Sequence, residues 1–442
     1  MILGNKGRSS KDVLTLYGKI TFDRTMLVPV DKTSADALLK YNGAKSVCPV
    51  DDLLGISDLP FKMTYRMMAA IAKEATYARS FTDAAERIRE RFGEEISVST
   101  IQNVTEFVGN WMFTEQYCQA IRAQASAGEK VDGRTIHKRK DDVLYIETDG
   151  AMVFVRDKNT SVIDGITGKT KTAPSDSGTE NVPGWTESKH AICFHADDIK
   201  YYYEDKAEKK HTARFKELLK LDRSKIEITG TRIERRDCIG YIGPADEFQY
   251  HLLALARRNN WEHCTKVVLL SDGAKWIKGI KDTVLSGRPV IQILDLYHAK
   301  ENAGKFANYV KHSEKQRKEY ADHLCDLIEQ GSTDKVLEEL KEYENEKMPD
   351  NVPNLYTYID NNKPFMDYPA YRKAGLFVGS GAMESANIYM MQDRMKLPGM
   401  RWNKKRGQHI LTLKSYMAAR NWDEVEAQLY DCCYGHSWMK SE

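Results

Sequence analysis

Three acidic residues are the first candidates for chemistry in this sequence, because each stands beside a segment with a clear structural pattern. Asp149 follows the β-branched and aromatic run "VLYIET", and Asp272 follows a continuous apolar run, Val267 to Leu270. Glu384 lies near the start of a predicted helix. An acid just beyond a buried strand lies at the carboxyl edge of its sheet, where α/β proteins build their sites. The acids are far apart along the chain, so only the fold can bring them together.

Each acid also has a purely structural explanation. Asp149-Gly150 is a turn-prone dipeptide that would join two short strands. Asp272 would serve as the N-cap of a helix that begins near Ala274, and Glu384 as a favourable charge at a helix N-terminus. Taken singly, these explanations are at least as strong as the functional one. The combination of the acids with the motifs around them favours a shared site.

A shared site of carboxylates indicates metal-dependent chemistry at phosphorus. Unpaired carboxylates repel one another, whereas a pair of Mg²⁺ ions about 3.5–4 Å apart makes their approach favourable. One ion of such a pair activates a water or a 3′-hydroxyl, and the other stabilises the leaving oxygen. Hard oxygen ligands suit Mg²⁺ or Mn²⁺, and the sequence has no His/Cys cluster at zinc-binding spacing, so zinc is the less favoured metal.

A basic and aromatic segment follows Glu384. The predicted helix, with Ser380 as its expected cap, continues for about four turns and stops at Pro398-Gly399. Cations along its end would neutralise phosphates, and an aromatic side chain would stack on an exposed base. The alternative is a solvated helix end in which the tryptophan anchors the core. The predicted DNA contacts of this segment are Arg394, Lys396, Arg401, Trp402, Lys404, Lys405 and Arg406.

Residues 60–125 predict a helical region that contains a helix, a glycine turn and a second helix. Serine or threonine residues at 80–82 and 97–99 supply the caps, and Gly93 stops the first helix. This is the pattern of a helix-turn-helix, in which the second helix offers early polar side chains to a DNA groove. An ordinary αα-hairpin in a bundle has the same pattern. The polar residues expected to reach DNA are Gln102 and Asn103.

Hydrophobic periodicity organises the rest of the chain. Residues 12–30 alternate apolar and polar side chains around Gly18, which indicates a small β-hairpin or arm. From Asp141 onward, apolar runs alternate with helical stretches, a pattern typical of strands covered on both faces of a sheet. The loop "GITGKT" has too few residues between its glycines for a phosphate-binding loop. The highly charged stretch 311–350 predicts an inserted or projecting helical segment.

The composition describes a globular protein without a uniform charge. Of 442 residues, 41% are hydrophobic and 29% charged, and the net charge of +2 excludes a uniformly basic protein but not a basic patch. The 8 cysteines are scattered and form no CxxC pair, which predicts free thiols in a reducing cytosol. We expect no signal peptide and no membrane span, and therefore a cytoplasmic protein.

At these residues the chain resembles the DDE-type transposases of bacterial insertion sequences, most closely the Kra and Lre groups, which are related to the Mutator-like class. The matching motifs are "YIETDGAMV", "LLSDGAKWI", "ILDLYHAKEN" and "GSGAMESANIYMMQDRMKLPGMRW". The resemblance implies an RNase H-like catalytic domain in which Asp149, Asp272 and Glu384 are the catalytic acids. It implies two Mg²⁺ or Mn²⁺ ions per active site, held by the same acids.

The motif "DLYH" adds two further candidates. Asp295 and His298 are three residues apart, so on a helix they share a face. The resemblance implies that His298 positions DNA or a catalytic water, and a purely structural role explains it equally well. Asp295 stands where Mutator-like relatives often have cysteine.

The expected fold is α/β: an RNase H-like mixed sheet flanked by helices with a helical insertion, preceded by an all-α helix-turn-helix region. The expected divisions are a β-arm at 1–59, a DNA-binding region at 60–125, and a catalytic domain at 126–310 and 371–442. The helical insertion is expected at 311–370, and the basic tail lies in the last division.

The expected function is transposition. The protein would bind the terminal inverted repeats of double-stranded DNA, cleave at the ends and join the freed 3′-hydroxyls to target DNA. Since two ends must be held together, this mechanism implies a homodimer or a higher oligomer. One alternative is an RNase H-like nuclease, such as a resolvase, that cuts without joining. Another is a non-catalytic DNA-binding protein derived from a transposase. A carboxylate-pair glycosidase is more distant, and metal dependence would separate it.

Overall fold

The computed structural model describes residues 2–434 apart from 43–44, 58, 135–141, 157–182, 206, 208, 219, 223–224, 350 and 380. The loop "GITGKT" and the expected cap Ser380 therefore lie outside the described residues. Among the described residues, no helix is both long enough and apolar enough to cross a membrane.

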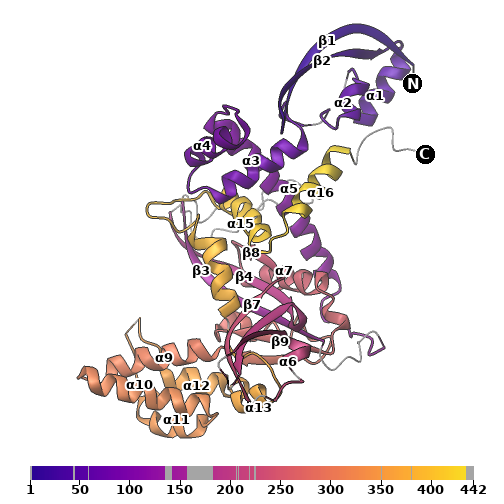
Figure 1. Ribbon diagram of the computed structural model, residues 1–442. Helices are drawn as coiled ribbons and strands as arrows, with labels where there is room; N and C mark the ends of the chain where they lie inside the picture. Colours follow the sequence, from indigo (N-terminus) through magenta and orange to yellow (C-terminus); the bar gives the residue numbers. More distant parts are fainter. Residues whose placement is uncertain are drawn as a thin grey trace.

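The chain begins with a long antiparallel hairpin, β1 (Leu3–Thr15) and β2 (Gly18–Pro29), which arches away from the rest of the molecule (Figure 1). The hairpin expected around Gly18 is thus confirmed, although its first strand starts nearer the N-terminus than the alternation indicated. Two short helices follow it, α1 (Lys32–Asn42) and α2 (Pro49–Leu53).

Three helices form the next region: α3 (Tyr65–Tyr77), α4 (Phe81–Phe92) and α5 (Val98–Ala125). The Ser80 hydroxyl accepts from the Asp83 N–H at 2.9 Å, and the Ser97 hydroxyl accepts from the Thr100 N–H at 3.2 Å. Gly93 ends α4 with φ at +70°, a conformation that favours glycine. Helix, glycine turn and helix are therefore present, but α5 runs for 28 residues and continues towards the sheet (Figure 1).

The central sheet has five strands: β3 (Val143–Val155), β4 (Gly184–His195), β8 (Asp237–Tyr241), β9 (Lys266–Ser271) and β10 (Ile291–Leu294). Their spatial order is β10-β9-β3-β4-β8. β9 and β10 run parallel to β3, whereas β4 is antiparallel to both β3 and β8. The expected mixed α/β sheet flanked by helices is confirmed.

One local expectation is wrong. Asp149-Gly150 does not join two short strands, because β3 runs through it without a break and pairs with β4 along its whole length. The pairing of Asp149 with His190 and of Gly150 with Lys189 supplies the extended conformation that the dipeptide alone does not favour. Asp149 therefore lies within a strand.

Alternate residues of β3 enter two different cores. Leu144 and Ile146 pack with α7 (Ala245–Arg258) and the short α8 (Lys275–Lys278) on one face. On the other face, Tyr145 and Val153 pack with α9 (Leu296–Val310), α14 (Gly381–Asn387) and the π-helical turn η6 (Ile388–Gln392). The odd-numbered positions of β3, which include Asp149, therefore face α9 and α14.

The helix expected from Ser380 to Pro398 is shorter than predicted. α14 ends at Asn387 and the chain widens into η6, which buries the consecutive side chains Met390 and Met391. Wide turns of this kind are frequent at functional sites.

A second, smaller sheet has the order β6-β5-β7, with strands β5 (Ile199–Asp205), β6 (Lys210–Arg214) and β7 (Ile226–Ile233). Two short helical turns flank it, η1 (Ala196–Asp198) and α6 (Phe215–Leu218). A further turn, η3 (Trp261–His263), follows α7 and packs in the core on the α7 side of the central sheet.

The charged stretch after α9 is helical, as expected, and forms a group of helices at one end of the molecule (Figure 1). Its elements are α10 (Glu314–Glu329), α11 (Thr333–Glu339), η4 (Lys341–Tyr343), α12 (Leu355–Asn362), η5 (Lys363–Phe365) and α13 (Tyr368–Lys373).

The last helices, α15 (Lys404–Ala418) and α16 (Trp422–Tyr434), return to the helical region. α15 is fastened to the edge strand β8, because the Gln408 side chain accepts from Ile242 N–H at 2.7 Å and donates to the Gly240 carbonyl at 3.0 Å. Leu413 of α15 and Trp422 of α16 join the core formed by α3 and α5. These helices therefore connect the sheet to the predicted DNA-binding region.

The close approach of α5 to α15 predicts the effect of adding one methyl group. A Cβ at Gly109 would stand 2.7 Å from His409 Cβ and 2.9 Å from its carbonyl oxygen. We expect Gly109→Ala to lower the free energy of unfolding by about 1–3 kcal/mol, measured as the midpoint of urea unfolding.

Gly304→Ala is the matched control. Gly304 lies inside α9, where an added Cβ meets nothing within 4 Å, so the change should raise stability by about 0.5–1 kcal/mol. An unchanged midpoint for Gly109→Ala would show that the helices lie further apart than described.

Candidate active site

Three aspartates stand side by side at the same level of the central sheet. The register pairs Thr148 of β3 with Ser271 of β9, and Ser271 with Leu294 of β10. In each of these three strands the following residue along the chain is an aspartate: Asp149, Asp272 and Asp295. β9 and β10 end at this level whereas β3 continues, so the row lies where the sheet narrows. The sequence predicted the first two members at a carboxyl edge, and the register brings them together.

Asp149 is held by two donors. Its Oδ1 accepts from the Gly150 N–H at 2.7 Å, and its Oδ2 accepts from the Asn387 side-chain amide of α14 at 2.5 Å. Burial raises the pKa of Asp149, and the neighbouring charge of Asp272 raises it further, while these hydrogen bonds and His298 oppose the rise. The carboxylate therefore occupies a site where a nearby cation would be favourable.

A buried hydrogen-bond chain extends from Asp149 and was missed from the sequence. Because Asn387 donates to Asp149, its Oδ1 faces His190 Nδ1 at 2.6 Å, and His190 Nε2 lies 2.9 Å from the Ser188 hydroxyl. Burial lowers the pKa of His190 to about 4, so the ring is neutral at pH 7 and Nδ1 carries its proton. The available signal was the alternation of Ser188 and His190 in a strand opposite Asp149.

Asp272 lies in a tight turn between β9 and α8. Its Oδ1 accepts from the Ala274 N–H at 2.9 Å, and its main-chain carbonyl accepts from the Tyr358 hydroxyl at 2.9 Å. Ala274, not Asp272, is the N-cap residue of α8, and α8 has no side-chain cap. Burial raises the pKa of Asp272, opposed by the Ala274 N–H and by the charge of His298.

Asp295 and His298 form an ion pair at the start of α9. Asp295 is the N-cap of this helix and is fully buried, with Oδ1 accepting from the Tyr297 N–H at 2.6 Å. Its Oδ2 lies 3.0 Å from His298 Nδ1. The hydrogen bond to Asp295 raises the pKa of His298 to about 9, with further contributions from Asp295, Asp149 and Asp272. An imidazolium therefore faces the row of aspartates at neutral pH.

Glu384 reaches the same cavity from the other side. It is exposed in the first turn of α14, and it lines a cavity of about 440 Å³ together with Asp149, Asp295 and His298. Glu301 of α9 and Lys396 line this cavity as well. Asp272 does not line it directly, but its charge acts on Asp149 and on His298. Asp149 and Glu384 thus line one cavity, and Asp272 lies close enough to Asp149 for its charge to act there.

The acids are close but not tightly clustered. Among the described residues, Asp149, Asp272 and Glu384 do not form a group whose ligand oxygens all lie within 4.8 Å of one another. Asp149 and Asp272 are each held by local donors, Asn387 and the Ala274 N–H.

Glu147 is a further buried acid that sequence reasoning missed. It lies two residues before Asp149 on the same face of β3, and its Oε2 accepts from the Met383 N–H of α14 at 2.8 Å. Burial raises the pKa of Glu147 to about 8, so the group is mostly protonated at neutral pH. Glu147 and Asn387 together fix α14, and hence Glu384, against β3.

Two of the predicted DNA contacts are buried, which corrects the sequence interpretation. Arg394 is 2% exposed, donates to the Arg79 carbonyl and stacks on the ring of Phe81 at 5.0 Å. Trp402 is 8% exposed, and its indole N–H donates to the Met395 carbonyl at 3.1 Å. Neither side chain is available to DNA, because both join the η6–α15 segment to the start of α4 and to β3. The core anchor was the correct alternative for Trp402.

The remaining basic residues are accessible. Lys396 lines the cavity of the acids, and Lys405 is exposed. Arg401 and Arg406 line a second cavity of about 270 Å³, with Gln102 from the start of α5. In that cavity, Arg406 pairs with Glu106 at 3.2 Å, and the Gln102 amide donates to Glu106 at 2.8 Å. Asn103 is exposed beside Gln102, and Lys404 is half-buried.

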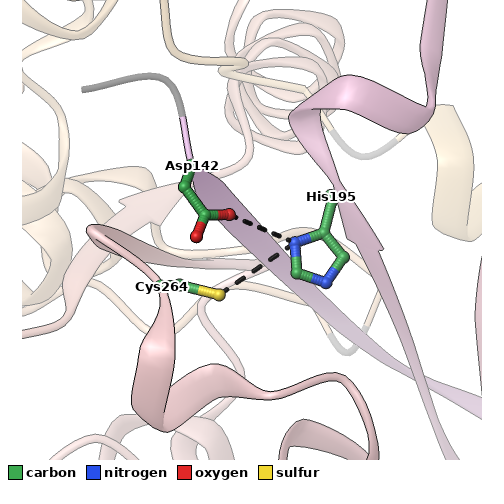
Figure 2. A group of neighbouring side chains, drawn as sticks. All are labelled: Asp142, His195 and Cys264. Carbon is green, nitrogen blue, oxygen red and sulfur yellow. Dashed lines mark hydrogen bonds and ion pairs between the residues drawn. The ribbon is translucent and has the colours of Figure 1, made fainter. Parts of the chain in front are cut away.

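A third group of side chains lies at the opposite edge of the central sheet. Asp142 precedes β3, His195 ends β4 and Cys264 precedes β9, and Figure 2 shows their side chains turned towards one another. Within the described part of the chain, this is the group of His, Cys, Asp or Glu whose ligand atoms all lie within 4.8 Å. Sequence spacing did not indicate it, because the fold brings together residues that are far apart along the chain.

The comparisons with known proteins leave the site to be interpreted from its geometry. The chain matches no protein-family model, and no curated protein matches it.

The ion pair at the start of α9 predicts the titration of His298. We expect its imidazole to stay protonated until about pH 9, since Asp295 stabilises the cation. In Asp295→Asn, the pKa should fall towards the ordinary value of about 6.5, because the cap is retained but the charge is lost. The measurement is a histidine-resolved NMR titration.

His190 is the internal control for this titration, since burial keeps it neutral down to about pH 4 in both proteins. A pKa of His298 that does not change in Asp295→Asn would contradict the pairing.

Proposed function

We propose that the protein is a DDE-type DNA transposase that binds the terminal inverted repeats of a mobile element, cleaves at the ends and transfers the strands to target DNA. The observation that carries this proposal is the row of Asp149, Asp272 and Asp295, with Glu384 and His298 around the adjoining cavity. Acids gathered at one sheet edge beside cationic side chains suit phosphodiester chemistry.

The order of the strands supports an RNase H-like catalytic domain. In chain order the five strands are β3, β4, β8, β9 and β10. β4 alone runs in the opposite direction, and the other four strands run parallel to one another. The helices between α9 and α14 interrupt the domain between the second and third predicted acids, as an insertion would.

The oxygen donors suit hard divalent cations. Asp149, Asp272 and Glu384 are the residues that would hold Mg²⁺ or Mn²⁺, since the pKa values of both aspartates are raised by burial and a bound cation would relieve that cost. Such ions would supply activation of a water or a 3′-hydroxyl and stabilisation of the leaving oxygen.

The other residues of the cavity have roles that follow from their contacts. Asn387 orients the carboxylate of Asp149. His298, held cationic by Asp295, and Lys396 place positive charge beside the acids, where a phosphate would lie. Neutralising phosphates with such cations is the main source of affinity for DNA.

We propose that DNA runs from the cavity towards the helical region. Lys396 lines this cavity, and Arg401 and Arg406 line the second cavity with Gln102. The backbone of Trp402 pairs with β3 through mutual hydrogen bonds with Phe154 and Arg156, which fixes this basic segment against the catalytic sheet. We assign α4 and α5 as the helix-turn-helix, with Gln102 and Asn103 facing DNA. Two ends must be held at once, so the active form is a homodimer or a higher oligomer.

The acids predict the outcome of conservative substitutions. Asp149→Asn, Asp272→Asn or Glu384→Gln should lower Mg²⁺-dependent cleavage by more than about 100-fold, because even partners outside the metal's own ligands are worth about 10–100-fold. DNA binding should change little. The assay incubates candidate element ends with Mg²⁺ and maps nicks and joined products on sequencing gels.

Glu301→Gln is the matched control, because Glu301 lines the same cavity but is exposed and paired with Lys305 at 2.8 Å. Its cleavage should remain near that of the parent. Nicks without joined products would indicate the nuclease alternative, and binding without nicks the non-catalytic one. Normal cleavage by Asp149→Asn would remove that residue from the site.

The accessible cations predict a change in salt dependence. Replacing Arg401 and Lys405 together by alanine should reduce the slope of log K against log salt concentration by about 2, since each phosphate contact contributes about 0.9. The control replaces Lys318 and Lys335, two exposed cations on α10 and α11, and should leave the slope unchanged. Fluorescence anisotropy with labelled duplex DNA at several salt concentrations measures both. Equal slopes in the two double variants would argue against a DNA contact at the basic segment.

A further inference from the structure

We propose that Asp142, His195 and Cys264 form a zinc site that is separate from the acids and stabilises the central sheet. Its ligands come from the ends of three adjacent strands, β3, β4 and β9 (Figure 2). The proposal does not depend on the transposase function, because it rests on residues at the opposite edge of the sheet.

The spacing of the ligand atoms is close to that of a metal site. His195 Nδ1 lies 3.6 Å from Asp142 Oδ1 and 4.0 Å from Cys264 Sγ, and all three atoms lie within 4.8 Å of one another. Atoms bound to a tetrahedral zinc at about 2.0–2.3 Å stand about 3.3–3.8 Å apart. Small side-chain movements would therefore complete the site around an ion.

The donor set selects the kind of metal. A thiolate, an imidazole and a carboxylate together suit zinc, whereas Mg²⁺ and Ca²⁺ prefer oxygen ligands alone. Three protein ligands leave a fourth position for a solvent molecule. Asp142 and His195 are partly exposed, at 22% and 30% of their side chains, so an ion has a route to the buried sulfur.

A catalytic thiol is the competing explanation for a Cys, His and Asp group. Cys264 is 1% exposed, and its thiol donates to the Asn260 carbonyl at 3.4 Å. A nucleophile with so little exposure cannot reach a substrate, which favours a structural role.

The site would act on the alignment of the strands. The Asp142 carbonyl accepts from the Lys266 N–H at 3.1 Å, where the pairing of β3 with β9 begins, and His195 pairs with Leu144 in the antiparallel ladder. An ion held by Asp142, His195 and Cys264 would therefore fix the same strand register that places Asp149 beside Asp272. Metal binding then stabilises the folded state, because the unfolded chain does not assemble the ligands.

The test uses the full chain, freed of metal with a chelator and dialysed. Zn²⁺ should bind at one ion per chain in competition with a chromophoric chelator and raise the melting temperature. Co²⁺ as a probe should give a thiolate-to-cobalt charge-transfer band. We expect Cys264→Ser to abolish the band and weaken zinc binding at least about 100-fold, since a metal ligand is lost. His195→Gln and Asp142→Asn, at partly exposed positions, should also weaken binding.

Matched controls separate this site from other cysteines and from the acids. Cys325→Ser removes a thiol that likewise donates to a main-chain carbonyl, that of Lys300 at 3.8 Å, and should keep both the stoichiometry and the cobalt band. Asp149→Asn should keep them too, and excess Mg²⁺ should not displace the zinc. Circular dichroism of each metal-free variant checks its folding.

The proposal is overturned if the parent binds no zinc, since the group is then only a hydrogen-bonded cluster. It is also overturned if the folded His195→Gln and Asp142→Asn variants bind zinc as tightly as the parent. A parent protein that binds zinc but does not cleave DNA would count against the proposed function alone.

Discussion

The constraint on which the structure depends is the cost of placing several carboxylates at one level of a buried sheet. Parallel pairing of β3, β9 and β10 fixes Asp149, Asp272 and Asp295 in a row, and burial raises the pKa of the first two. Buried like charges are unfavourable unless donors or cations compensate them. The surrounding elements are arranged to do this: α9 supplies the His298 cation, and α14 supplies the Asn387 amide.

The same contacts also determine how the helices cover the sheet. Asp295 caps α9 and pairs with its first-turn histidine, so the position of that helix is tied to the end of β10. Glu147 accepts from the start of α14 and Asn387 donates from its end, so both ends of this short helix are bound to β3. Polar groups at the site therefore also position its walls, and a change in one is expected to affect the geometry of the others.

How far the sequence predicted this arrangement depended on whether a signal was local. The apolar run that ends before Asp272 identified the end of β9, and the serine caps and Gly93 identified α4 and α5. Non-local pairing decided the rest. β4 holds Asp149-Gly150 extended against its turn preference, and stacking on Phe81 buries Arg394, which looked like a surface cation in the sequence. Contacts between distant strands leave no periodic signal in one sequence.

Strand β3 links the two edges of the sheet, with Asp142 before its start and Asp149 near its middle. At about 3.3 Å per residue, these positions are about 23 Å apart, a distance at which two unit charges interact by less than about 1 kcal/mol at an effective dielectric constant of about 20. Charge at one edge therefore has little direct effect on charge at the other. What the two edges share is the register of the strands. A slip of β3 by one residue against β9 would move Asp149 away from Asp272 and turn its side chain to the other face of the sheet. Any coupling between the acids and the Asp142, His195 and Cys264 group must therefore be mechanical, through the ladder that both edges require.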